Sequence, residues 1–203
     1  MHQHLEDCFK EAVRVAKLLF DRNKVTGSSG NISFRYGGHI YISGSGTCFG
    51  WLQRCDFAEL DDEGNVLSEV KPSKEYPLHK IIYDARPDIY AVIHTHSFYS
   101  VLASCIADES NCDIFKDITP YLRMKVGSIG MIPEAPPGSE KLFQLLKERA
   151  HLSDGYLLAN HGPVTGGRNI REAFYGIEEL EETAKIHYYL HALEGEDQRW
   201  QNY

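Results

Sequence analysis

The spacing of apolar positions along the chain predicts helices at its two ends and between its strands. Apolar residues recur at three- and four-residue steps over residues 3–20, which predicts an amphipathic helix. Further helices are predicted over residues 75–85, 139–150 and 170–192. The last of these opens with Asn169 and Glu172 at the spacing of a capping box.

Strand patterns lie between these helices. The segment NISFRYGGHIYIS, residues 31–43, predicts a β-hairpin because its two central glycines suit a tight two-residue turn. The polar cluster DDEGN at 61–65 predicts a turn between short strands. Further strands are predicted at residues 90–96, 123–132 and 155–161, the last ending where Gly162-Pro163 is expected to turn the chain. This order predicts an α/β fold whose central, largely antiparallel sheet is covered by helices.

Composition and charge narrow the class of protein. The chain of 203 residues shows no repeat or linker, so we expect a single domain over residues 1–203 with a substantial core. A formal net charge of −8 argues against a general nucleic-acid binder, while a local pocket for a small anionic substrate stays possible.

Three observations predict a cytoplasmic protein without a membrane partner. No apolar run approaches the roughly 20 residues that span a bilayer. The first residues, MHQHLEDCFK, lack the pattern of a signal peptide. The five cysteines are an odd number without disulfide or zinc-finger spacing, which is typical of reduced thiols in a cytosol.

A histidine pair interrupts the apolar strand AVIHTHSFYS, residues 91–100. In a strand, His94 and His96 would point to the same face, roughly 6–7 Å apart, and so supply half of a metal site. A surface pair without a function is the alternative. A catalytic zinc takes about three protein ligands and keeps an open position. His161, at the end of the strand in LLANHGPV, is the candidate third ligand.

The segment KPSKEYPLH places a carboxylate, Glu75, at the start of a predicted helix. It could simply complement the helix dipole. However, the preceding Pro72-Ser73-Lys74 adds a hydroxyl, a cation and free backbone N–H groups, which together suit an anion. His79, four residues after Glu75, either faces the same site or only packs.

Two glycine-rich loops repeat this chemistry. TGSSGNIS at 26–33 and SGSGT at 43–47 expose backbone amides and hydroxyls that allow close approach of an anion. Neither is a Walker or dinucleotide motif, and either alone could be an ordinary hairpin turn. Three such loops beside a possible metal suggest a phosphorylated, metal-chelating substrate.

The motifs SGNIS, SGSG, KPSKE, HTH and NHG occur in the order and spacing of the class II aldolase/adducin family, which the chain resembles over roughly residues 5–192. The resemblance implies a class II aldolase-like domain with a divalent metal, usually Zn²⁺, although Mn²⁺, Co²⁺ or Fe²⁺ suit the same ligands. It implies that Glu75 transfers a proton and ligates the metal when substrate is absent. The implied metal ligands are His94, His96 and His161, and the implied phosphate contacts are Gly30, Asn31, Ser45, Gly46 and Ser73.

Within the family, the chain resembles one branch of lyases. Lys74 stands where sugar-phosphate aldolases of the L-fuculose-phosphate type tend to carry a second hydroxyl residue. Residues 117–127, LLANHGPV and residues 177–185 resemble enzymes that decarboxylate 3-oxo-tetronate 4-phosphate to dihydroxyacetone phosphate and CO₂ through a metal-stabilised enediolate. In that reaction Lys74 would hold the departing carboxylate or a phosphate oxygen, unless it is only a solvated lysine. Arg123 departs from the branch and leaves the exact substrate open.

Two other functions stay open from the sequence. An aldolase or dehydratase acting on another sugar phosphate would use the same metal site. An adducin-like module without catalysis should lack ligands, whereas all three histidines and Glu75 are present. Family members commonly form fourfold homotetramers, so Tyr121, Trp200 or Tyr203 could complete the pocket of a neighbouring subunit.

Overall fold

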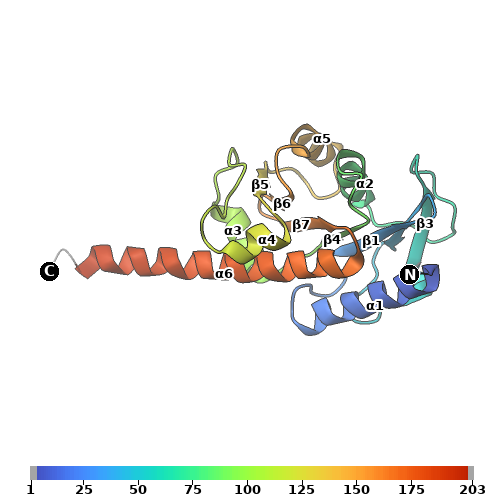
Figure 1. Ribbon diagram of the computed structural model, residues 1–203, viewed down its shortest axis with the longest axis horizontal. Helices are drawn as coiled ribbons and strands as arrows, with labels where there is room; N and C mark the ends of the chain where they lie inside the picture. The colour runs from blue at the N-terminus through green and yellow to red at the C-terminus, as the bar shows by residue number, and fades with distance from the viewer. Residues whose placement is uncertain (1–3, 201–203) are drawn as a thin grey trace.

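A seven-stranded sheet forms the centre of the structure (Figure 1). The computed structural model describes residues 4–200, with side chains described for residues 4–193. The strand order is β3-β2-β1-β4-β7-β6-β5, and every neighbouring pair is antiparallel except β5 and β6. This confirms the predicted largely antiparallel sheet. The strands are β1 (Asn31–Tyr36), β2 (His39–Ser43), β3 (Phe57–Asp61), β4 (Ala91–His94), β5 (Ile129–Ile132), β6 (Gly155–Leu158) and β7 (Gly162–Gly167).

Helices cover both faces of this sheet. Helices α1 and α6 lie on one face and α2 and α5 on the other, while α3 and α4 pack beside α6 (Figure 1). The helices are α1 (Leu5–Asp21), α2 (Tyr76–Ala85), α3 (Phe98–Ile106), α4 (Pro120–Lys125), α5 (Glu140–Arg149) and α6 (Ile170–Trp200), with a 3₁₀ turn at Arg54–Asp56. Within residues 4–200, no helix combines the length and the apolar character that crossing a membrane requires.

The two-residue period of the strands divides the core into two layers. On β1, Ile32 and Phe34 join the apolar cluster under α1 and α6. The alternate residues of β1, Asn31 and Ser33, are polar, and they point toward α2 on the opposite face. A group of buried polar side chains therefore lies between β1 and α2.

Helix α6 begins as the capping pattern predicts. The side chain of Asn169 accepts a hydrogen bond from the backbone N–H of Glu172 at 2.9 Å. The carboxylate of Glu172 reaches back to the backbone N–H of Arg168, at 3.2 Å, instead of to that of Asn169. The helix also continues past the predicted end at residue 192, to Trp200.

Several strand predictions were wrong in their extent or type. Residues 123–132 were expected as one strand, but α4 occupies 120–125 and only Ile129–Ile132 is a strand. Pro120 supplies the fixed φ angle that suits the first turn of α4. The turn at 61–65 forms as expected, although the segment after it pairs with β3 at a single bridge, Leu60 with Val66.

The turn expected at Gly162-Pro163 lies earlier. Strand β6 ends at Leu158, residues 159–161 turn, and Gly162 already begins β7, which the sequence prediction missed. The apolar run of β7 is short and rich in glycine, so it carries little strand signal of its own. Its pairing with β4 and β6 on both sides supplies the missing stabilisation.

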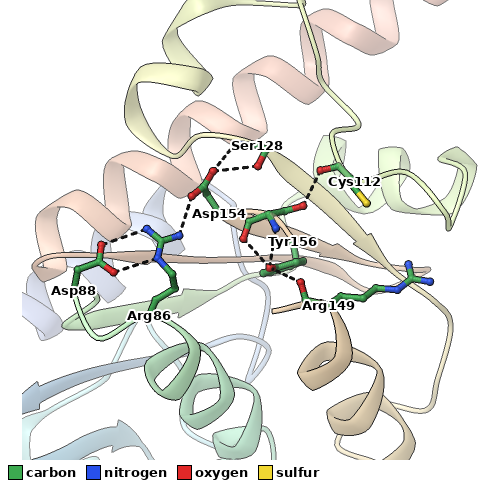
Figure 2. Close-up of polar contacts among 8 residues, drawn as sticks. Arg86, Asp88, Cys112, Ser128, Arg149, Asp154 and Tyr156 are labelled. Atoms are coloured by element: carbon green, nitrogen blue, oxygen red, sulfur yellow. Dashed lines mark hydrogen bonds and ion pairs between the residues drawn. The ribbon is translucent and has the colours of Figure 1, made fainter. Parts of the chain in front are cut away.

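A polar network closes the end of the sheet near the start of β6 (Figure 2). Asp154 accepts hydrogen bonds from the backbone N–H of Ser128 at 3.0 Å and from Arg86 at 2.8 Å. Arg86 also pairs with Asp88, and the neighbouring Asp88 first, then Asp154, raise the pKa of this guanidinium. The network joins the end of α2 to the start of β5 and β6, which fixes the frame that carries the site.

Candidate active site

Three histidines from separate segments meet where β4 and β7 pair. His94 is the last residue of β4, His96 lies two residues further, and His161 lies in the turn between β6 and β7. Their Nε2 atoms form a triangle with sides of 3.1, 3.2 and 3.1 Å. The predicted convergence of the three rings is therefore present. His96 lies two residues beyond the end of β4, and its Nε2 lies 3.1 Å from that of His94.

Close backbone contact brings the turn of His161 against the segment of His96. Gly162 has a φ of +151°, and a Cβ at this position would lie 2.4 Å from the carbonyl oxygen of Thr95. A side chain there would push the two segments apart. The NHG motif thus needs its glycine to hold His161 and His96 within reach of one ion.

The three rings present lone pairs to one another. Burial lowers the pKa of His94 and of His161 to about 3 and also lowers the pKa of His96, so the imidazoles are neutral. Nδ1 of His94 donates to the carbonyl oxygen of Pro163 at 2.9 Å, which leaves the Nε2 lone pair directed at the triangle.

This donor set fits a divalent metal. A tetrahedral ion with Zn–N bonds of about 2.0–2.1 Å places neighbouring ligand nitrogens roughly 3.3 Å apart, close to the observed sides of the triangle. Nε2 of His94, whose proton lies on Nδ1, directs its lone pair into the triangle, where a cation would accept it. No other group of three potential ligand side chains gathers in this way within the described residues.

Glu75 faces the same triangle. It precedes the first residue of α2, is 5% exposed, and makes no capping hydrogen bond with its side chain. Its Oε1 lies 3.4 Å from Nε2 of His161 and its Oε2 lies 3.5 Å from Nε2 of His94. The carboxylate therefore lies at the edge of the triangle, within 3.5 Å of two of its three nitrogens. Glu75 thus contacts two histidines from the N-terminal end of α2, where its charge also complements the helix dipole.

One oxygen of this carboxylate is held and the other is not. Nδ2 of Asn31 donates to Oε2 of Glu75 at 2.9 Å. Oε1 is buried and has no hydrogen-bond partner among the described residues, and the same is true of Nδ1 of His161. A buried carboxylate oxygen without a donor is costly to a folded protein. Its position beside the histidines is consistent with a partner that binds there during function.

A cavity of about 1030 Å³ opens above the histidines. The site residues inferred from sequence that line it are Gly30, Asn31, Ser45, Gly46, Ser73, Lys74, Glu75, His96 and His161, and His94 lies fully buried beside them. Sequence reasoning did not single out the other lining residues, Asn23, Thr26, Ser28, Ser29, Gly44, Phe98, Val101, Pro137 and Asn160. Thr26, Ser28 and Ser29 belong to the glycine-rich loop at 26–33, whose hydroxyls the sequence indicated as a group without assigning each residue.

Gly30 is required where this loop passes under the site. It has a φ of +80°, and a Cβ there would lie 2.9 Å from the carbonyl oxygen of His94. The loop therefore packs directly on the end of β4, and its hydroxyl residues line the same cavity as His96 and His161. This contact between backbones is a reason for glycine at position 30 in addition to the approach of an anion.

Tyr121 and Arg123 are not among the residues that line the cavity. Tyr121 is 61% exposed on α4 and does not line the cavity of its own chain. Arg123 forms an ion pair with Asp113. The side chain of Trp200 and the whole of Tyr203 lie outside the described residues.

The N terminus of α3 lies next to His96 but is already occupied. Glu181, which is buried on α6, accepts from the backbone N–H of Ser100 at 2.9 Å and from its hydroxyl at 2.7 Å. It also accepts from the backbone N–H of Tyr99 at 3.2 Å. A carboxylate therefore fills this helix end, and an anionic substrate is better served by the glycine-rich loops on the other side.

The fold and the site together define a lyase-like scaffold in which three histidines and a carboxylate meet at strand ends. The chain belongs to the class II aldolase family: the model described as Class II Aldolase and Adducin N-terminal domain matches residues 10–188. This confirms the resemblance drawn from the motifs and, with it, dependence on a divalent metal.

Characterised relatives include two kinds of lyase. The chain is 37% identical over 178 residues to 3-oxo-tetronate 4-phosphate decarboxylase of Escherichia coli K12, covering 87% of this chain and 84% of that protein. It is also 37% identical over 183 residues to L-fuculose phosphate aldolase of Methanococcus maripaludis, covering 90% and 97%. The crystal structure of YgbL from Klebsiella pneumoniae superposes with a TM-score of 0.88 at 35% identity, covering 93% of this chain and 92% of that one.

Proposed function

We propose that this protein is a metal-dependent decarboxylase that converts 3-oxo-tetronate 4-phosphate into dihydroxyacetone phosphate and CO₂. The observation that carries the proposal is the triangle of His94, His96 and His161, with Glu75 beside it, at the base of a cavity lined by glycine-rich loops. The similarity to 3-oxo-tetronate 4-phosphate decarboxylases at 35–38% identity supports this substrate.

The proposed ion is Zn²⁺, held by the three histidines. Imidazole ligands suit zinc, and three neutral ligands leave the ion its full double positive charge. When bound, the ion supplies Lewis-acid stabilisation of the negative charge that develops on the C3 carbonyl oxygen of the substrate. Pro163 fixes the orientation of His94 for this role through its carbonyl oxygen.

The glycine-rich loops would bind the phosphate. Ser45 and Gly46 from one loop and Ser28, Ser29 and Gly30 from the other line the cavity. Their backbone amides and hydroxyls can donate to phosphate oxygens at a place where no bulky side chain prevents close approach. Holding the phosphate converts remote binding energy into orientation of the carboxylate end of the substrate at the histidines.

Lys74 and Glu75 would act at the other end of the substrate. Lys74 lines the cavity, and its stem lies over Gly138, where an added Cβ would be 3.1 Å from Cδ of the lysine. Its ammonium group can orient the C1 carboxylate. When the C1–C2 bond breaks, CO₂ leaves and the electron pair stays with the C2–C3 fragment. Glu75, after taking a proton from solvent on Oε1, delivers that proton to C2 and returns to the carboxylate.

Aldol cleavage of a sugar phosphate is the second candidate. The aldolase of Methanococcus maripaludis is as similar in identity, at 37%, as the decarboxylase of Escherichia coli. Both reactions break a carbon–carbon bond next to a carbonyl group, so the histidines and Glu75 serve either one. They differ in the group that leaves, which is an aldehyde in one case and CO₂ in the other. Lys74 favours the anionic leaving end.

A direct comparison of two substrates tests the assignment. We expect kcat/KM for CO₂ release from 3-oxo-tetronate 4-phosphate to exceed that for cleavage of L-fuculose 1-phosphate by about tenfold or more, because a hydrogen bond to a charged group contributes about 1.5–3 kcal/mol. Lys74→Gln should reduce the first value and leave the second nearly unchanged. Faster cleavage of fuculose 1-phosphate without CO₂ release would assign the protein to the aldolases.

The protein is further proposed to be a cytoplasmic homotetramer. The second half of α6 projects from the body (Figure 1) and exposes Tyr189, Leu190 and Leu193, at 51%, 45% and 60%. Apolar side chains on a projecting helix are typical of a surface that another subunit covers. The five cysteines are free thiols, which suits a reducing compartment. Light scattering should give about four times the chain mass of 23.1 kDa. A monomeric mass would contradict the assembly, and cell fractionation checks the compartment.

A further inference from the structure

A ladder of buried polar side chains joins β1 to α2 directly beneath Glu75. On β1, Asn31 and Ser33 are alternate residues and face the same side. On α2, His79 and Tyr83 are four residues apart and share one face of the helix. All four side chains are at most 3% exposed, and the proposed function assigns no role to three of them.

The hydrogen bonds of this ladder run in one direction. Nδ2 of Asn31 must face Glu75, because a carboxylate only accepts. The amide oxygen of Asn31 therefore faces Nε2 of His79, at 2.5 Å, and this nitrogen must carry a proton. Burial lowers the pKa of His79 to about 3, so the ring is neutral and its Nδ1 accepts from the hydroxyl of Ser33 at 2.7 Å.

Tyr83 completes the sequence of donors. Its phenol lies 2.7 Å from the hydroxyl oxygen of Ser33, which has already given its proton to His79. The phenol therefore donates to Ser33. Each group in turn, from Tyr83 through Ser33, His79 and Asn31, donates toward Glu75. In a dry interior, reversing any member would leave two acceptors or two donors in contact, which is strongly unfavourable.

The end of this ladder makes the two oxygens of Glu75 different. Oε2 receives the hydrogen bond of Asn31, whereas Oε1 has no donor and lies 3.4 Å from Nε2 of His161. A freely turning amide at residue 31 could present its own oxygen to the carboxylate instead. The contact with His79 prevents this, because Nε2–H of His79 offers a donor only to the amide oxygen.

We propose that His79 is a positioning residue that fixes the orientation of the Asn31 amide, so that Glu75 is held by Oε2 and presents Oε1 for proton transfer. The role in proton transfer rests on the proposed function, while the orientation of the ladder does not. A packing role alone would require only a side chain of similar volume at position 79. The positioning role and the packing role therefore predict different kcat values for His79→Gln and His79→Met.

Kinetics of His79 variants test this difference. His79→Met keeps the volume and removes the donor, and we expect kcat to fall by about 10- to 100-fold with KM changed less than about threefold. His79→Gln keeps a donor toward Asn31, and we expect it to restore kcat to within about threefold of the unchanged protein. Ile82→Ala, a buried change on the same helix, should lower the unfolding temperature without lowering kcat.

Three further measurements test whether His79 acts through Asn31. In the background of Asn31→Ala, His79→Met should reduce kcat by less than about twofold more, because the group through which it acts is gone. In the metal-free protein labelled with ¹⁵N-histidine, the NMR spectrum should show the Nε2–H tautomer for His79. Metal affinity should be unchanged in His79→Met, because no ligand is altered.

Any one of four results would contradict the positioning role of His79. The kinetic ones are an unchanged kcat in His79→Met, a kcat in folded His79→Gln as low as in His79→Met, or losses in kcat that add when His79→Met is combined with Asn31→Ala. The fourth is an NMR spectrum that shows the Nδ1–H tautomer of His79. If the substrate assignment fails and aldol cleavage is found, the same kinetic comparison applies to that substrate. The tautomer measurement needs no substrate, so failure of the proposed function and failure of the ladder are distinguishable.

Discussion

Replacing Glu75 with glutamine is expected to lower kcat by about 10²- to 10⁴-fold, the range over which a positioned acid or base contributes. Glutamine has nearly the same shape, and its side-chain oxygen can still accept from Asn31, so the helix start and the ladder should survive. What is lost is the oxygen that carries the proton to C2. Steady-state assays of CO₂ release measure the effect, and Glu75→Ala should abolish turnover as well.

The control for this variant is the same chemical change at a distance. Glu63→Gln removes a carboxylate from the exposed turn after β3 and should leave kcat unchanged. The thermal unfolding temperature of Glu75→Gln should match or exceed that of the unchanged protein, because a buried carboxylate with an unpaired oxygen has been neutralised. A folded Glu75→Gln that keeps more than about a tenth of the activity would remove Glu75 from the proton transfer.

Removal of the divalent ion is expected to reduce turnover by about three orders of magnitude or more. Lewis-acid stabilisation contributes several kcal/mol, and each 1.36 kcal/mol is a factor of ten in rate. Activity should return when Zn²⁺ is added back. The unfolding temperature should also fall on chelation, because an ion bound only by the folded state stabilises it, by about 2.7 kcal/mol at a hundred times its Kd.

Histidine variants connect this effect to the proposed ligands. His161→Ala should lose both bound metal, measured by elemental analysis, and activity, because two nitrogens alone hold an ion weakly. His151→Ala alters an exposed histidine after α5 and should keep both. Full activity after exhaustive chelation, or undiminished metal content in His161→Ala, would contradict the site. Elemental analysis of the unchanged protein also identifies the ion.

Elements with a strong local pattern were predicted well from the sequence. The amphipathic period of α1, the two-glycine turn between β1 and β2, and the cap at Asn169 all form as predicted. In each case the signal lies within one short segment. The apolar run at 123–132 was misassigned because α4 and β5 are both short, and only their packing against α6 and β6 separates them.

The candidate site was predictable in its residues but not in its connections. The motifs identified His94, His96, His161 and Glu75, and all four now lie within 3.5 Å of a neighbour in the group. The ladder beneath Glu75 was not predicted, because Ser33 ends the SGNIS motif without an assigned role and Tyr83 belongs to no motif. Tyr121 was inferred from family behaviour and does not line the cavity of its own chain.

The sequence by itself determined which chemical groups the site can use, because residue types and motif spacing specify which donors, acids and glycine-rich loops are present. It also determined the helices and the hairpin, because the spacing of their apolar and turn residues is contained within each short segment. Only the tertiary structure decided that three nitrogens face one point, that one oxygen of Glu75 is held and the other is bare, and which way the buried amide of Asn31 turns. These properties depend on contacts between strands and helices far apart in the chain, whose geometry no local pattern contains.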